Sequence, residues 1–193
     1  FYALWQLKKS ETLTYNFSLA NNFTDISKLA QGYVFSNYSS LFSGNRYLEN
    51  SLSQVHSLRY FKYNMFNFEN IFANITYTKQ VDAVKNRALL IGPNRVSSAV
   101  NINSNFADQT LSGVANYGRS FLRYYKASFG LSLNWSEFNN IRVAQDDSES
   151  IQMTKSFAQN YNLRFSTNFK EAPNLELAYS YSINDNFSDV FYT

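Results

Sequence analysis

The side chains best suited to chemistry are few, and their spacing builds no catalytic group. His56 is the only histidine, and the chain has no cysteine. A histidine base needs a nucleophile within reach and a third group that orients it. No spacing here supplies either, so we interpret His56 as a polar residue near a strand end. A transition-metal site would lack ligands, and motifs for phosphate loops, nucleophile elbows and zinc helices are missing. The sequence therefore predicts neither an enzyme nor a cofactor.

A short acidic cluster is the remaining candidate for metal binding. Asp146, Asp147 and Glu149 stand together in the segment AQDDSES. Carboxylate oxygens at this density can bind Ca²⁺, but the spacing does not follow the EF-hand loop. A calcium site and a solvated loop both remain open, and the spacing favours the loop.

The composition excludes several classes of protein. The 193 residues carry 17 basic and 14 acidic side chains, and the basic ones are scattered singly, which argues against nucleic acid as a partner. Aromatic residues make up 18% of the chain, too many for a disordered protein. No apolar run reaches the ~20 residues of a spanning helix. The opening FYALWQL resembles no signal peptide, and we expect one domain that is a piece of a longer chain.

The dominant pattern is a period of two, the period of a β-strand. In Tyr125–Trp135 every odd position is apolar. Every even position is small or polar, and Lys126 is the one charged residue among them. A strand would place these two sets on opposite faces. Similar alternation predicts further strands at Leu13–Phe23, Gln54–Phe66, Ile71–Tyr77, Val96–Ile102, Phe157–Phe169 and Leu175–Ile183. In Gln54–Phe66, Leu58 and Tyr60 break the parity set by Phe61 and Tyr63.

The connections between the predicted strands alternate in length. Short polar segments that suit hairpin turns are Lys8–Glu11, Asn67–Asn70 and Lys170–Asn174. Longer, more charged segments are Thr24–Ser53, Lys79–Asn94 and Ala144–Ser150. Asp25–Gly32 has the cap and stop signals of a short helix within the first of these. Short connections at one end and long ones at the other predict an up-and-down meander.

Two environments produce strands with one apolar face. A soluble sandwich uses strands of ~5–6 residues and dots its outer face with Lys and Glu. The predicted strands are longer and match the ~9–11 residues that cross an outer membrane. Their polar faces carry mainly Asn, Ser, Thr and Ala, which suits a hydrated lumen, and Tyr125, Trp135, Phe157 and Phe169 suit the aromatic girdles of such a barrel. The predicted fold is an all-β, antiparallel up-and-down transmembrane β-barrel with about eight strands present.

Isolated charges on the predicted strands have two interpretations each. Lys126, Arg164 and Glu176 lie on polar faces, where they would either line a substrate path in the lumen or pair across neighbouring strands. A second set, near the predicted outer ends, would either contact lipopolysaccharide phosphates or be ordinary loop charge. This set comprises Arg46, Arg59, Lys62, Lys85, Arg87 and Arg95.

The segment Leu41–Val84 resembles the barrel of TonB-dependent outer-membrane receptors of Gram-negative bacteria. In that family a Gly-Asn-Pro-x-Leu-x-Pro-Glu element follows a long surface loop and precedes two strands. Gly44, Asn45, Leu48 and Glu49 occupy a version of it, with Arg46 in place of a proline and Asn50-Ser51 in place of Pro-Glu. The stretch Val96–Asn105 with Leu111–Gly118 resembles a later descending strand of this family, and Phe157–Ile183 resembles its penultimate hairpins. The resemblance is greatest to the subgroup with an N-terminal carboxypeptidase-regulatory-like domain.

The resemblance implies that residues 1–193 are a C-terminal portion of a barrel of about 22 strands, with neither plug domain nor TonB box. It implies a receptor that takes up a ligand with energy relayed through TonB, and long loops that face outward. We expect ligand contacts first at Tyr33, Tyr38, Arg46 and Tyr47. The implied partners are outer-membrane lipid and lipopolysaccharide, the rest of the barrel and its plug, the TonB system and a surface lipoprotein.

Two other functions remain open from the sequence. One is a structural or adhesion-type outer-membrane barrel without energised transport. The other is a soluble all-β binding module, which would fold without detergent, whereas a barrel segment outside its membrane would aggregate through apolar faces and open edges.

Overall fold

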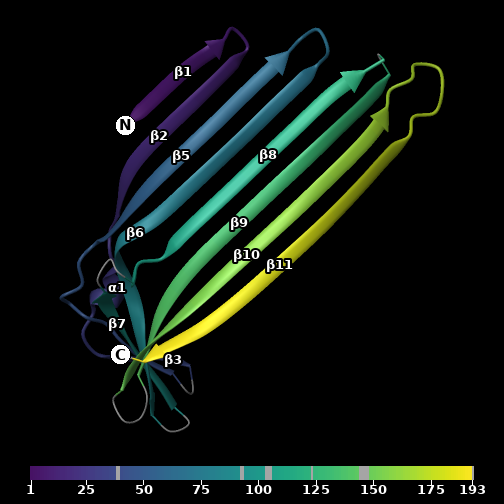
Figure 1. Ribbon diagram of the computed structural model, residues 1–193. Helices are drawn as coiled ribbons and strands as arrows, with labels where there is room; N and C mark the ends of the chain where they lie inside the picture. The colour runs from purple at the N-terminus through teal and green to yellow at the C-terminus, as the bar shows by residue number, and fades with distance from the viewer. Residues whose placement is uncertain (38–39, 92–93, 103–105, 123, 144–147, 193) are drawn as a thin grey trace.

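The computed structural model describes residues 1–37, 40–91, 94–102, 106–122, 124–143 and 148–192. Eight long strands follow one another in a single up-and-down sheet (Figure 1). In chain order these are β1 (Tyr2–Lys8), β2 (Glu11–Asn22), β5 (Ser51–Asn64), β6 (Glu69–Ile91), β8 (Gln109–Phe121), β9 (Tyr125–Val143), β10 (Glu149–Thr167) and β11 (Glu176–Tyr192). Every neighbouring pair along this path is antiparallel. The predicted all-β meander is confirmed.

The sheet is open at both edges within the described part of the chain. β1 pairs only with β2, and β11 pairs only with β10. The predicted closure into a barrel is therefore not seen in the described residues. Each edge leaves a row of backbone N–H and C=O groups without a strand partner, and such a row is a template for pairing with another strand.

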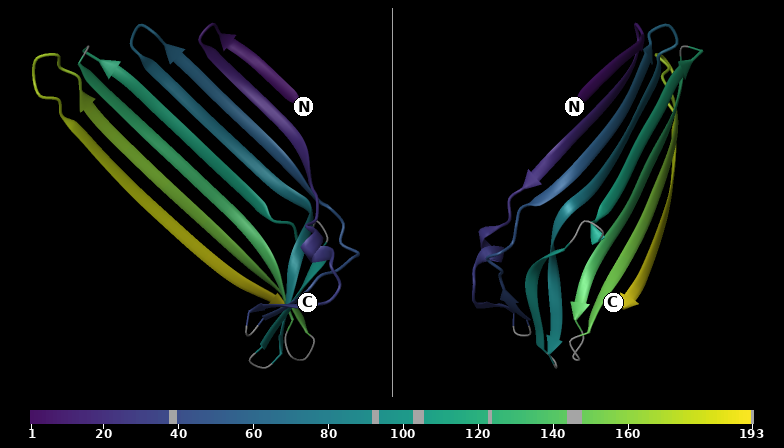
Figure 2. Two further views of the ribbon diagram at one scale, coloured as in Figure 1. Left: turned by 180° about the vertical axis from the view of Figure 1, so that it is seen from behind. Right: turned by 60° about the vertical axis from the view of Figure 1, so that its left-hand side comes forward.

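The connections alternate as predicted. The turns β1–β2, β5–β6, β8–β9 and β10–β11 gather at one end of the sheet, and the long connections gather at the other (Figures 1 and 2). Asparagine side chains shape two of the short turns. The Asn64 carboxamide oxygen accepts from the Phe66 backbone N–H at 2.9 Å, which ends β5 two residues before the predicted Phe66. The Asn174 oxygen accepts from the Phe169 N–H at 2.6 Å, and β10 ends at Thr167 rather than Phe169.

Two strands run beyond the ends predicted for them. β6 runs 23 residues to Ile91 and forms a hairpin with β7 (Asn94–Ile102), so most of Lys79–Asn94 is not a loop. Local charge made this stretch look like a loop, but Lys85 and Arg87 are paired with Asp108 and Glu149. β11 likewise continues past Ile183, because β10 extends far enough to pair with all of it.

The sheet changes its strand order at the end that holds the long connections. β6 pairs with β8 over Asn70–Lys79, and then leaves it for β7 and for a short parallel pairing with β9. β7 pairs in parallel with β4 (Ser40–Ser43), which pairs with β3 (Tyr33–Asn37). The three additional strands, β3, β4 and β7, thus extend the sheet at this end (Figure 2).

The predicted helix within Asp25–Gly32 is the single turn α1 (Ile26–Leu29). The Asp25 carboxylate accepts from the Ser27 N–H at 2.9 Å and caps the turn. Gly44 packs directly on this turn, where a Cβ would lie 2.4 Å from the Ala30 carbonyl oxygen. The Asn45 N–H donates to the Lys28 carbonyl at 2.7 Å, so the Gly-Asn pair ties the connection between β2 and β5 together.

The strand register assembles one continuous apolar face. Residues directly opposite each other share a face. Across β2, β5, β6, β8, β9, β10 and β11 one such row reads Tyr15, Leu58, Ile75, Gly113, Leu133, Gln159 and Ile183. Leu58 and Tyr60 of β5 lie on this face, and Phe61 and Tyr63 lie on the other. The parity suggested for this strand by its aromatic residues was therefore wrong.

Charges on the apolar face lie toward the strand ends, and they include Arg119 of β8, opposite Ala127 of β9, and Asp185 of β11, opposite Phe157 of β10. On β9, Glu137 follows the apolar run that ends at Trp135, and it pairs with Lys155 of β10 at 3.4 Å. At the end with the short turns, Lys62 pairs with Glu69 at 3.5 Å. Between these margins, the described strands carry no Asp, Glu, Lys or Arg on this face from Ala127 to Trp135 of β9 or from Phe157 to Phe165 of β10.

The sheet has almost no interior of its own. Among the described residues no large side chain is fully buried, and the buried apolar side chains are Leu48, Ala83, Ala107 and Val143. The accessible surface is 13472 Å². A folded monomer of 22.3 kDa is expected to expose about 9,400 Å². The two faces of the sheet account for this excess, since Leu163 and Tyr179 of the apolar face are 55% and 65% exposed.

Candidate functional site

The opposite face of the sheet is polar and built from small side chains. Paired positions on β8, β9 and β10 place Ser, Asn, Gly and Thr next to one another, as in Asn116–Gly130–Asn162 and Gly118–Ser128–Arg164. The sequence pattern predicted this face correctly for β9 and β10. It did not predict which polar residues meet, because the relative shift of two strands is not encoded in either strand alone.

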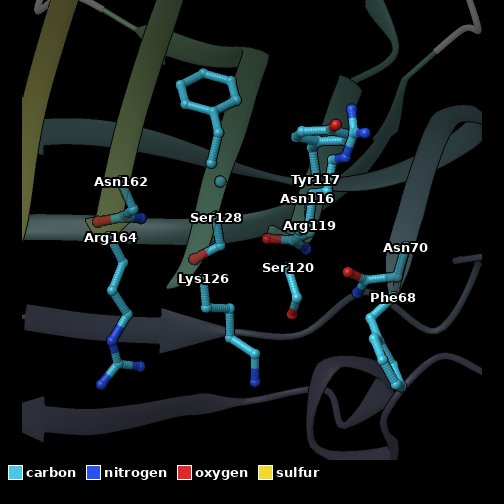
Figure 3. A pocket seen from close by; sticks show the side chains of 13 residues that line it. Phe68, Asn70, Asn116, Tyr117, Arg119, Ser120, Lys126, Ser128, Asn162 and Arg164 are labelled. Carbon is cyan, nitrogen blue, oxygen red and sulfur yellow. The ribbon is translucent and has the colours of Figure 1, made fainter. Parts of the chain in front are cut away.

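A hollow of about 370 Å³ lies on this polar face, toward the end with the short turns (Figure 3). Its lining includes Asn70, Asn116 and Asn162 from three strands, with the hydroxyl-bearing Ser120 and Ser128. Lys126 and Arg164 extend to the same side of the sheet, whereas the Tyr117 side chain points away from them (Figure 3). The lining contains no Asp or Glu among the described residues.

Two glycines form part of the floor of this hollow and leave room for the asparagines. A Cβ on Gly130 would lie 3.1 Å from Oδ1 of Asn116, and one on Gly118 would lie 2.3 Å from Oδ1 of Asn70. Each carboxamide therefore lies across the neighbouring strand at a glycine. The hollow exists because these two strand positions carry no side chain.

The three predicted lumen charges lie on one face, and two of them pair. Nε of Arg164 donates to Oε1 of Glu176 at 2.9 Å, and a second guanidinium nitrogen contacts the same oxygen. Both side chains are more than half exposed, so this bond contributes little to stability. Lys126 has no hydrogen bond or ion pair with any described residue. Cross-strand pairing thus accounts for Arg164 and Glu176, and leaves Lys126 as a free cation.

The predicted ligand-binding residues lie at the opposite end of the sheet from the hollow. Tyr33 begins β3 and Tyr47 lies in the turn after β4, and their side chains are 72% and 74% exposed. The Arg46 guanidinium lies over the Tyr47 ring, 5.1 Å from its centroid. Tyr38 lies outside the described residues. The structure brings Arg46 and Tyr47 together and shows no contact of either with Tyr33.

The segment after β4 is fastened to the end of β2. Oγ1 of Thr24 donates to the Glu49 carbonyl at 2.7 Å, and the Thr24 N–H donates to Oδ1 of Asn50 at 3.1 Å. Leu48, within the same segment, is buried. Arg46 and Tyr47 are therefore presented to solvent by a fixed turn.

The described members of the second set of basic residues each contact another side chain of the protein. Arg59 lies 5.9 Å from the Phe72 ring centroid, and Arg87 pairs with Glu149 at 2.5 Å. Lys85 is buried against Asp108, so it is not available to lipopolysaccharide. The side chain of Arg95 lies outside the described residues.

A buried polar cluster around Lys85 went undetected in the sequence. Its ammonium contacts Asp108, and the other Asp108 oxygen accepts from the Asn139 N–H at 2.9 Å. Nδ2 of Asn139 donates to the Ala107 carbonyl at 3.4 Å. The cluster sits where β6 leaves β8 for β9. No local sequence pattern predicts this cluster, because its three charged or polar members are far apart in the chain.

His56 lies inside a strand, and not at a strand end as predicted. It lies within β5 on the apolar face, with Nδ1 2.8 Å from the Tyr15 hydroxyl and its ring 4.8 Å from that of Phe17. Asp146 and Asp147 of the acidic cluster lie outside the described residues. Within the described part of the chain, no group of three or more His, Asp or Glu side chains could hold a metal ion.

Among the described residues, no helix is long and apolar enough to cross a membrane. Comparison of the chain with known protein families, with curated proteins and with solved structures finds no match.

Proposed function

We propose that the chain forms part of the wall of a transmembrane β-barrel in the outer membrane of a Gram-negative cell. The barrel belongs, in this proposal, to a receptor of the TonB-dependent class that takes up a ligand with energy supplied from the inner membrane. The observation that carries the proposal is the pair of faces. One is apolar and uncovered, with its charges toward the strand ends, and the other is polar and made mainly of small side chains.

The height of the apolar face supports a membrane environment. On β9 it runs from Tyr125 to Trp135, with Glu137 immediately beyond. Ten steps of ~3.3 Å along a strand tilted by ~40° rise about 25 Å, the height of the apolar band of an outer-membrane barrel. Aromatic rings mark both ends of this run. Tyr125 lies 5.8 Å from Phe169 and 6.0 Å from Phe165, and Trp135 is paired with Phe157.

The small number of buried apolar residues argues against a soluble module. A domain of this length in water needs a core on the side of the sheet where the apolar residues lie. The described residues supply no second layer there, and the apolar side chains remain exposed. Membrane lipid would cover the apolar face without a second protein layer. The opposite, polar face would then contact water or another polar protein surface.

The open edges support membership in a larger barrel. β1 has only 7 residues and β11 has 17, so the two edges do not match in length. Further strands beside each edge would satisfy the free backbone groups, which lipid does not. The choice of the TonB-dependent class rests on the resemblance of Leu41–Val84 and of the later strands, including Phe157–Ile183. In this role the chain supplies wall, lumen surface and loops, and no catalytic residue.

Gel mobility of the native protein in purified outer membranes tests the proposal. A folded barrel resists detergent until it is boiled, so the expected result is a heat-modifiable band several times larger than 22.3 kDa. A heat-modifiable band near 22.3 kDa would indicate a small self-contained barrel and remove the TonB-dependent assignment. Recovery in the soluble fraction without a mobility change would contradict any membrane role.

A second assay separates transport from a purely structural barrel. Cells with and without a functional TonB system should differ in growth when the protein is required for uptake of a limiting nutrient. Equal growth across a panel of nutrients, with the heat-modifiable band intact, would favour the structural or adhesion-type barrel.

A further inference from the structure

The hollow on the polar face continues into a second hollow at the end with the short turns. The second has a volume of about 760 Å³ and shares Asn70, Ser120 and Lys126 with the first. Its outer rim is apolar, since Phe66, Phe68 and Leu122 line it and are 99%, 61% and 78% exposed. One groove thus joins a polar floor to an apolar rim.

The rim residues are held in an unusual backbone conformation. Phe68 and Leu122 have φ angles of 49° and 48°, in the left-handed region that bulky side chains rarely adopt. They belong to two neighbouring turns, and both line the second hollow. Glycine or asparagine would satisfy such turn positions more easily. Large apolar side chains at both positions indicate a use for their surface.

The charges that line the two hollows determine which charge a ligand must carry. Lys126 lines both hollows without a partner among the described residues. Arg119 also lines both, but its side chain points away from Lys126 (Figure 3), and no described lining residue is acidic. The Arg164 charge is offset by Glu176, which lines neither hollow. Carboxamides of Asn70, Asn116 and Asn162 and the hydroxyl of Ser128 line the first hollow together with Lys126. A free cation in a concave, polar site attracts an anion.

We propose that this groove binds a small organic anion that has an apolar portion, such as an aromatic carboxylate. Lys126 forms the ion pair, the asparagine carboxamides hydrogen-bond the oxygens, and Phe66, Phe68 and Leu122 contact the apolar portion. The inference rests on the proposed function, in that it takes the polar face to line the aqueous lumen. It names the substrate class for that surface.

Binding of fluorinated probes to the native full-length protein in nanodiscs tests this inference. ¹⁹F NMR would compare 4-fluorobenzoate, 4-fluorobenzyl alcohol and 4-fluorobenzylamine, which share a ring and differ in charge. The expected order of affinity is carboxylate, alcohol, amine. Binding of the carboxylate no tighter than the alcohol would overturn the inference.

Four variants assign the binding to its residues. Lys126→Gln should weaken 4-fluorobenzoate about fivefold and leave the alcohol unchanged. Lys170→Gln, which removes a charge from a nearby turn outside both hollows, should change neither. Phe68→Gly keeps the left-handed turn and removes the ring, so it should weaken both probes. Glu176→Gln frees Arg164 and should strengthen 4-fluorobenzoate. Equal effects of the two lysine variants would overturn the inference.

The same samples separate this inference from the proposed function. A protein that shows the heat-modifiable band and fails to distinguish the probes contradicts the groove alone. A protein without that band contradicts the barrel, whatever it binds.

Discussion

Loss of the Lys85 ammonium should destabilise the end of the sheet that holds the long connections. Lys85 and Asp108 are ion-paired with side chains only 8% and 14% exposed. Lys85→Met keeps the length of the side chain and leaves the Asp108 carboxylate buried with the Asn139 N–H as its remaining donor. An unpaired buried charge costs about 3–5 kcal/mol. Because the Asn139 hydrogen bond survives, we expect a loss near the lower value, about 3 kcal/mol.

A matched lysine provides the control for this variant. Lys155 also pairs with a carboxylate, Glu137 at 3.4 Å, but its side chain is 42% exposed. Lys155→Met should therefore cost less than about 1 kcal/mol. The double variant Lys85→Met with Asp108→Asn should recover much of the loss, since neither residue then brings a charge into the site.

Unfolding of the refolded protein in urea, followed by hydrogen exchange of β7, would measure these differences. β7 pairs with the part of β6 that carries Lys85, so its amides should lose protection first. The reasoning fails if Lys85→Met and Lys155→Met reduce the free energy of unfolding equally. It also fails if the double variant is less stable than Lys85→Met.

Two further predictions concern the connection between β2 and β5. Gly44→Ala places a Cβ against the Ala30 and Lys28 carbonyls, so α1 must shift and proteolysis of this connection should rise. Gly118→Ala meets only the movable Asn70 side chain, and equal proteolysis of both variants would contradict this difference. The backbone N–H of Ser27 holds the pKa of Asp25 below its usual value, so its capping is present at about pH 4 and is lost as the pH falls through the lowered pKa. Pepsin cleavage near α1, normalised to a free peptide, should therefore rise between about pH 4 and pH 2 in the wild type. Asp25→Ala should show no such rise, and a rise of the same size would refute the capping.

The faces of most strands were predictable from the sequence, because parity is a local property. In Tyr125–Trp135 every odd position is apolar, and β9 places those side chains on the apolar face. β5 was misread because the aromatic residues Phe61 and Tyr63 lie on the polar face close to a turn. Pairing with β2, not composition, decides which of its residues face lipid in the proposed barrel.

The arrangements that bring distant strands together were not predictable. The segment after Lys79 carries charges that suggest a loop, yet Asp108 and Glu149 neutralise two of them and allow β6 to continue. The groove depends on register, which sets Asn116 beside Gly130 and Asn70 beside Gly118. A shift by two residues would keep every face and abolish the hollow. Local sequence therefore indicates the faces, and only tertiary pairing creates the groove.

Labelling of two adjacent residues tests the central claim most directly. Leu131 and Ser132 lie in the middle of β9 on opposite faces, and the chain has no cysteine of its own. In intact outer membranes, a water-soluble maleimide should label Ser132→Cys and leave Leu131→Cys unlabelled until the protein is denatured. Labelling of Leu131→Cys as fast as Ser132→Cys in the membrane would show water on both faces of the sheet, and would contradict the proposed barrel wall.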